Sequence, residues 1–152
     1  MNVDPGLRIA EILDGLPAGT LRDFQSLTHP GWYPPGAVLF SAGDACAGVF
    51  WASSGQVNVS ALDHYAQQVT SHIAEPGEIL GLKAALCSEA YGATAWTKEP
   101  CEVNFIALND LSAFLSTHPD AVFRIVERLS DRLHLTIGQF RLISSSHLLK
   151  ND

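Results

Sequence analysis

Histidine and cysteine are the residue types of this chain that are best suited to hold a metal or to act as nucleophiles. The six histidines never form His-x-His or His-Glu-x-x-His, the pairs with which barrel enzymes and zinc proteases hold a metal. The three cysteines, Cys46, Cys87 and Cys101, form no Cys-x-x-Cys pair. The sequence also lacks a nucleophile elbow, a P-loop and a dinucleotide fingerprint. We therefore expect a protein that is not an enzyme and holds no metal, with a small metal-dependent barrel enzyme as the alternative.

Single residues leave two further kinds of chemistry open. Cys87 has one basic neighbour, Lys83, and would be a redox-responsive thiol. His72 or His134 would be an axial ligand if the protein held haem. A buried, inert cysteine and ordinary surface or core histidines are the plainer interpretations.

Composition points to one compact domain. The chain has 152 residues, of which 47% are hydrophobic and 16% charged, so it can build a core and has too little charge for a disordered protein. Its apolar runs are far shorter than the roughly 20 residues that span a membrane, and its start does not resemble a secretory signal. Together with the unpaired cysteines this favours the cytoplasm and no membrane. The net charge of −7 argues against a broad basic face for nucleic acid.

Two short helices are predicted near the N-terminus. Asp4 and Pro5 would cap and open the first, which Pro17 and Gly19 would end. The apolar residues of its single face are Ile9, Ile12, Leu13 and Leu16. The second helix fits residues 21–27 and stops before Pro30.

Short β-favouring runs alternate with turn signals from Trp32 to Leu108. The runs are residues 38–40, 49–51, 57–59, 69–73 and 103–106. Such spacing predicts an antiparallel sandwich or barrel, of which the jelly roll is one kind. The alanine- and leucine-rich stretch from Gly81 to Glu89 interrupts the pattern and predicts a short helix.

The C-terminal part of the chain is predicted to be helical again. Asn109 and Asp110 would cap a short helix through Phe114, and Pro119 would open a long one to about Ser144. Along the long helix, residues recur at steps of three and four, the spacing of a coiled-coil seam: Val122, Val126, Leu129, Leu133, Thr136, Phe140 and Ile143. We expect this seam, from Val126 to Ile143, to pair with that of a second copy. A broad stripe that faces the chain's own core in a monomer is the alternative.

The order of these elements and several motifs resemble the sensor domain of the catabolite-activator and Fnr (Crp–Fnr) family of regulators, a cyclic-nucleotide-binding domain. The motifs are residues 35–40, 42–44, 50–57, 76–81, 101–103 and 118–120, within a resemblance that covers roughly residues 20 to 145. It implies a mainly β fold with flanking helices, a double-stranded β-helix (jelly-roll) barrel and a homodimer through the long C-terminal helix. The expected segments are an N-terminal helical segment 1–30, the barrel 31–108 with a phosphate-cassette-like turn 77–94, and the helices 109–152.

The cassette departs from the family pattern. Nucleotide-binding members place a glutamate directly after the glycine that matches Gly81, and an arginine further on. Here the glutamate position is Leu82 and the arginine position is Tyr91 or Gly92, with no arginine between Arg22 and Arg124. The resemblance therefore implies a ligand-sensing module of transcription regulation that is degenerate for cyclic AMP and cyclic GMP. A non-standard cyclic nucleotide binder that uses Lys83 and backbone N–H groups is the alternative.

The resemblance also implies a candidate pocket. Its residues are Gly81, Leu82, Lys83, Tyr91, Gly92, Ala93, Thr94 and Thr136. A small-molecule effector is expected there, and a cyclic nucleotide or haem are the alternatives. Family regulators read DNA with a helix-turn-helix module after the long helix. This chain ends at Asp152 without one, so DNA is expected as a partner only if the full-length protein carries such a module.

Overall fold

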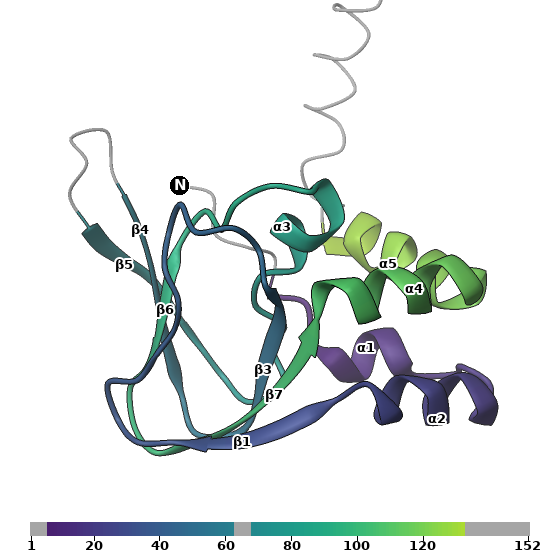
Figure 1. Ribbon diagram of the computed structural model, residues 1–152, viewed down its shortest axis with the longest axis horizontal. Helices are drawn as coiled ribbons and strands as arrows, with labels where there is room; N and C mark the ends of the chain where they lie inside the picture. Colours follow the sequence, from purple (N-terminus) through teal and green to yellow (C-terminus); the bar gives the residue numbers. More distant parts are fainter. Residues whose placement is uncertain (1–5, 63–67, 133–152) are drawn as a thin grey trace, which may run out of the picture.

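Two antiparallel sheets lie on one side of the molecule and most of the helices lie on the other, in a computed structural model that describes residues 6–62 and 68–132 (Figure 1). In chain order the elements are α1 (Ile9–Leu13), α2 (Ala18–Ser26), β1 (His29–Tyr33), β2 (Val38–Phe40), β3 (Gly48–Ser54), β4 (Val57–Leu62), β5 (Gln68–Ala74), α3 (Leu82–Cys87), β6 (Thr94–Thr97), β7 (Cys101–Ala107), α4 (Leu108–Thr117) and α5 (Pro119–Arg132). The mainly β fold with flanking helices is therefore confirmed.

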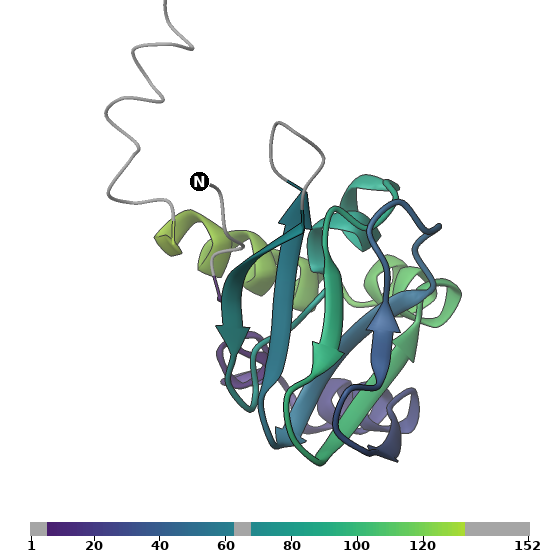
Figure 2. The ribbon, with the colours of Figure 1, turned by 90° about the vertical axis from the view of Figure 1, so that its left-hand side faces the viewer.

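The sheets have three and four strands, in the orders β1-β7-β3 and β2-β6-β4-β5. Figure 2 looks onto the strands, with the helices behind them. Because side chains alternate along a strand, each sheet turns one apolar row inward. These rows form a core with Phe40, Phe50, Val57, Ala95 and Val103 among its members.

A second core joins the three-stranded sheet to the helices. Trp51 of β3 stacks on Phe24 of α2 with ring centroids 5.8 Å apart, and Phe24 meets Phe114 of α4 edge-on at 5.5 Å. Ile125 of α5 and Ile106 of β7 belong to the same cluster. Helix α3 stands between the strands and α5 (Figure 1), so it contacts both halves of the molecule.

Every predicted β run lies in a strand, and the predicted insertion forms α3. Two strands, β1 and β6, were not predicted. The second helix does end before Pro30, as predicted, but Pro30 and Gly31 lie in β1. This strand is the edge of its sheet, where a proline without an N–H is tolerated.

The N-terminal boundaries were wrong by several residues. Helix α1 begins at Ile9 and not at Pro5, because Leu7 pairs with Ile79 through a backbone hydrogen bond of 2.9 Å. Pro17 is the N-cap of α2, so it starts that helix instead of ending α1.

The C-terminal helix α5 starts at Pro119, as predicted. Its predicted continuation to Ser144, with the seam residues Leu133, Thr136, Phe140 and Ile143, lies outside the described residues. Of the described helices, none has the length and apolar character needed to cross a membrane.

Candidate functional site

A cavity of about 180 Å³ opens between the 78–93 segment and the strands of the four-stranded sheet. It is smaller than the roughly 300–1,000 Å³ of most small-molecule pockets, so it suits a small ligand. Strands β2, β4 and β5 supply one wall, and α3 with the loop after it supplies the other. Its lining residues are Phe40, Val59, Ala61, His72, Glu78 to Gly81, Lys83, Ala84 and Glu89 to Ala93.

Gly81 forms the turn that leads into α3. Its φ of +85° is in the left-handed region, which favours glycine. A Cβ there would lie 2.9 Å from the Tyr91 ring and 3.1 Å from the Gly48 carbonyl oxygen. The missing side chain therefore lets the cassette backbone approach the ring of Tyr91 closely.

Tyr91 is tied to the start of β3 by its hydroxyl group. The oxygen accepts hydrogen bonds from the backbone N–H groups of Ala47 and Gly48, both at 3.0 Å, and the O–H donates to the Gly48 carbonyl at 2.7 Å. The ring stacks on Phe40 with centroids 4.1 Å apart. Burial raises the pKa of this phenol above its ordinary value. The polar atom of Tyr91 therefore already has backbone partners.

The charged groups of the cavity are Glu78, Glu89, Lys83 and, when protonated, His72. Glu78 is 8% exposed. One of its carboxylate oxygens lies 2.6 Å from His72 Nε2, and the other accepts a hydrogen bond from the Glu75 N–H at 3.2 Å. Lys83 and Glu89 are exposed at the rim. When His72 is neutral, the lining therefore carries two negative charges and one positive charge.

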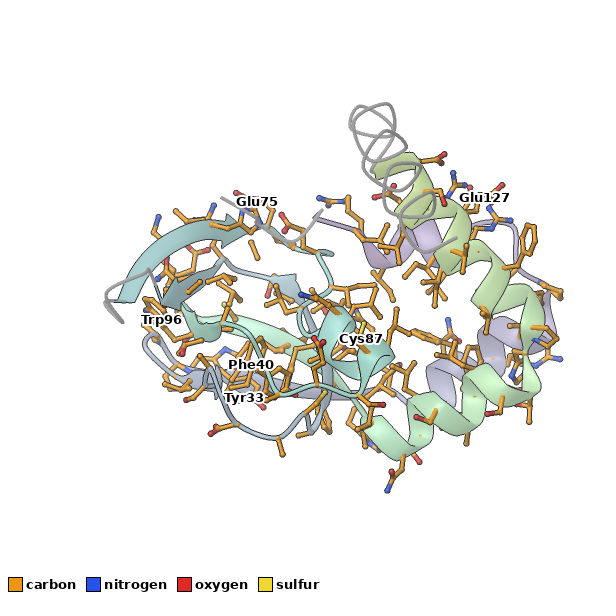
Figure 3. The ribbon with its side chains drawn as sticks, turned by 90° about the horizontal axis from the view of Figure 1, so that it is seen from above. Tyr33, Phe40, Glu75, Cys87, Trp96 and Glu127 are labelled. Atoms are coloured by element: carbon orange, nitrogen blue, oxygen red, sulfur yellow. The ribbon has the colours of Figure 1, made fainter. Side chains whose placement is uncertain are left out.

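The structure brings five of the predicted pocket residues to this cavity: Gly81, Lys83, Tyr91, Gly92 and Ala93. Leu82 does not line it. Its side chain packs on the helical side and borders a separate apolar cavity of about 210 Å³ with Leu7 and Leu129. Figure 3 shows α3, marked by Cys87, between the strands and the helices.

Thr94 does not line the cavity either. Its hydroxyl oxygen accepts a hydrogen bond from the Ala42 N–H at 3.0 Å, which fixes the loop beside β6. Thr136 lies outside the described residues.

Sequence reasoning missed Phe40 and Glu78 as cavity residues and considered His72 only as a haem ligand. Side chains alternate between the two faces of a strand, and this pattern along β2 and β5 could have predicted that Phe40 and His72 point inward. No local signal brings them to the cassette, because that contact depends on how the strands pair.

The environments of the cysteines and of His72 test the interpretations made from the sequence. Cys87 is exposed, so the plainer interpretation of a buried thiol is wrong. Cys101 is the buried cysteine, and burial raises the pKa of its thiol. His72 Nε2 contacts Glu78, so use of that nitrogen as a haem ligand would break the contact. Among the described residues, no group of three or more histidine, cysteine or acidic side chains could hold a metal.

Comparison with known proteins gives a family match. The model described as "Cyclic nucleotide-binding domain" matches residues 30–118. A comparison with curated proteins finds no significant match.

Solved structures share the fold. The catabolite activator protein of Thermus thermophilus superposes with a TM-score of 0.74 at 23% identity, over 88% of this chain and 63% of that protein. The sensor domain of the transcriptional regulator DNR from Pseudomonas aeruginosa gives 0.70 at 18% identity, over 84% and 86% of the two chains. The N-terminal domain of a transcriptional regulator from Streptomyces coelicolor A3(2) gives 0.71 at 17% identity, over 90% and 95%. The chain thus spans less than two thirds of the Thermus protein.

Proposed function

The chain belongs to the cyclic nucleotide-binding domain family, and from this premise we propose that it is the effector-sensing module of a Crp–Fnr-like transcription regulator. In this proposal the strands form a jelly roll, and the cavity beside α3 binds a small-molecule effector. The module is cytoplasmic and is not an enzyme. DNA is a partner in this proposal only if the full-length protein carries a helix-turn-helix module.

We further propose that the module is degenerate for cyclic AMP and cyclic GMP. The observation that carries this is that the segment at Tyr91 and Gly92, where the resemblance places the arginine of nucleotide-binding members, holds no cation. The Tyr91 hydroxyl there is hydrogen-bonded to the backbone of β3. A buried phosphate needs a charge-assisted partner. Lys83 is the one lysine or arginine that lines the cavity in the described part of the chain, and it is exposed to solvent that screens its charge.

The magnitude follows from the missing contacts. Loss of the charged phosphate partner costs on the order of 1.5–3 kcal/mol, and loss of the ribose hydrogen bond at Leu82 about 0.5–1.5 kcal/mol more. At about 1.4 kcal/mol per tenfold, affinity falls roughly thirtyfold to a thousandfold. Calorimetric titration with both cyclic nucleotides is therefore expected to show weak binding or none. Low-micromolar affinity would overturn the degeneracy.

A gain-of-function variant sharpens this test. Gly92 lines the cavity, and a Cβ there meets no heavy atom within 4 Å, so Gly92→Arg adds a cation at the cavity without a clash at its Cβ. We expect it to tighten cyclic AMP binding about tenfold or more. Ala113→Arg, on the exposed face of α4, is the matched control for added charge. If the wild type binds cyclic AMP and Lys83→Ala does not, the alternative of a non-standard cyclic nucleotide binder that uses Lys83 is correct.

The homodimer is a further part of the proposal. Val122 and Val126 of α5 share a face with Leu129, and Val126 is 57% exposed. Full burial of each such side chain contributes roughly 1.5–3 kcal/mol, which supports pairing of this face with a second copy. Light scattering on the wild type and on the double variant Leu133→Glu, Phe140→Glu tests it. A wild type that is monomeric at about tens of micromolar refutes the dimer.

A further inference from the structure

The charge of the cavity identifies the class of effector that it suits. A cyclic nucleotide is an anion, but the most buried acidic or basic side chain of the lining is a carboxylate, Glu78, which is 8% exposed. The second carboxylate, Glu89, lies at the rim close in sequence to the loop that carries Tyr91. The one lysine of the lining, Lys83, is exposed, so solvent screens its charge more than that of Glu78.

Glu78 retains capacity for another hydrogen-bond donor. A carboxylate offers about four lone-pair sites. Among the residues that the structure describes, two are used by the contacts of 2.6 Å with His72 Nε2 and 3.2 Å with the Glu75 N–H. Hydrogen bonds to an ionised acceptor are stronger when the donor is also charged, so an ammonium group is a good third partner. A phosphate or carboxylate at the same place would be repelled by Glu78.

The remainder of the lining is apolar. Phe40, Leu80 and Ala84 are buried core residues that border the cavity, and Val59 and Ala93 add to its apolar lining. Such a surface accepts a hydrocarbon or aromatic body and gains from its burial. The volume of about 180 Å³ admits only a small one.

We propose that this cavity binds a small organic cation, an amine with an apolar or aromatic body, in place of an anionic cyclic nucleotide. The ammonium group lies at Glu78, with Glu89 adding negative charge at the entrance, and the body of the ligand lies against the apolar wall. This inference rests on the proposed sensing function and names the ligand class of the same site.

Three probes with one skeleton and different charge test the proposal: 2-phenylethylamine, 2-phenylethanol and phenylacetate, which are cationic, neutral and anionic at neutral pH. Each is titrated into the full chain while backbone amide resonances of Gly81, Lys83 and Gly92 are followed by NMR, so that binding is located at the cavity. We expect the amine to bind most tightly and phenylacetate most weakly, with a difference on the order of tenfold. Phenylacetate binding as tightly as the amine overturns the proposal, and so does the absence of shifts for the amine up to millimolar concentration.

Variants assign the preference to its residues. Glu78→Gln should remove most of the preference for the amine. Because Glu78 is buried, Glu89→Gln at the exposed rim is the second variant, with a smaller reduction expected. Glu102→Gln, on an exposed position of β7, controls for the change in net charge and should leave the preference unchanged. A preference that survives in both cavity variants contradicts the assignment.

Titration of cyclic AMP in the same experiment separates this inference from the function on which it rests. Low-micromolar cyclic AMP binding at these resonances contradicts the cation proposal and the degeneracy for cyclic nucleotides, but it leaves the sensing function standing. Weak cyclic AMP binding together with a preference for phenylacetate contradicts the cation proposal alone and leaves the sensing module standing.

Discussion

Removal of one oxygen atom, in Tyr91→Phe, is expected to destabilise the fold strongly while leaving its shape unchanged. The Tyr91 hydroxyl accepts hydrogen bonds from the N–H groups of Ala47 and Gly48 and donates to the Gly48 carbonyl. Without it, these backbone groups at the start of β3 lose their side-chain partner, and Gly48 is buried. The ring itself and its stack on Phe40 remain.

The size of the loss follows from the number and burial of these contacts. A typical hydrogen bond contributes about 0.5–1.5 kcal/mol net, and a buried group left without a partner costs about 1–3 kcal/mol. With two contacts at buried Gly48 and one at Ala47, we expect the free energy of unfolding to fall by about 2–4 kcal/mol. That is a large share of the roughly 5–15 kcal/mol that holds a typical domain together.

Urea unfolding followed by tryptophan fluorescence measures this change. The midpoint should fall with an unchanged m-value, because the surface exposed on unfolding is the same. Tyr33→Phe is the matched control: Tyr33 is a partly buried tyrosine of the same core, and its hydroxyl has no hydrogen-bond partner among the described residues. If the two variants lose the same small free energy, below about 0.5 kcal/mol, the proposed role of the Tyr91 hydroxyl is wrong.

Alkaline pH gives an independent reading of the same group. Burial raises the pKa of Tyr91 above its ordinary value of 10.0, so the folded state favours the protonated phenol. This contribution to stability is full below pH 10 and is lost as the pH rises through the folded-state pKa. Tyr91→Phe should therefore lose less stability than the wild type between neutral pH and pH above 10. An identical alkaline loss in both proteins would contradict this.

Three further predictions concern contacts outside the cavity. The backbone carbonyl of Phe114 in α4, and after it Asp23, raise the pKa of His118 above 6.5. The contribution of this histidine to stability is therefore full below pH 6.5 and is lost as the pH rises through the folded-state pKa. NMR titration should show a lower His118 pKa in Asp23→Asn than in the wild type. Gly55→Ala should cost more stability than Gly36→Ala, because both have positive φ but only at Gly55 would a Cβ collide with the start of β7; equal losses would show that strain alone acts. Thr97→Val should cost about 1–3 kcal/mol in urea unfolding, because the buried hydroxyl bonds two backbone groups, at 2.6 and 2.8 Å; a change near zero would refute this.

The strand pattern could be predicted where local physics decides it. Val49 to Trp51 and Val103 to Ile106 are β-favouring runs between turn residues, and both lie inside strands. The N-terminal boundary of α1 was missed because Leu7 and Ile9 bond to the backbone at Gly77 and Ile79, about seventy residues away in the chain. Local capping rules consider only neighbours in the sequence, so they cannot predict that a distant backbone pairing keeps Leu7 out of the helix.

The residues of the candidate site also differ in how far the sequence predicts them. Gly81 and Lys83 could be found because they lie in one continuous segment, which also contains Glu78. Phe40 and His72 reach this segment only through the pairing of β2 and β5 with the rest of the sheet. The resemblance to the family places the missing arginine at Tyr91 or Gly92.

In the structure, the Tyr91 ring fills the space in front of Gly81, and its hydroxyl secures the start of β3. Restoring an arginine at position 91 would therefore remove a structural contact as well as add a charge. The neighbouring Gly92, whose Cβ position is open, is the place where a phosphate partner can be added while that contact is kept. If Tyr91→Arg bound cyclic AMP as tightly as Gly92→Arg, and at no greater cost in stability, Tyr91 would be a simple replacement and not part of the framework of the cavity.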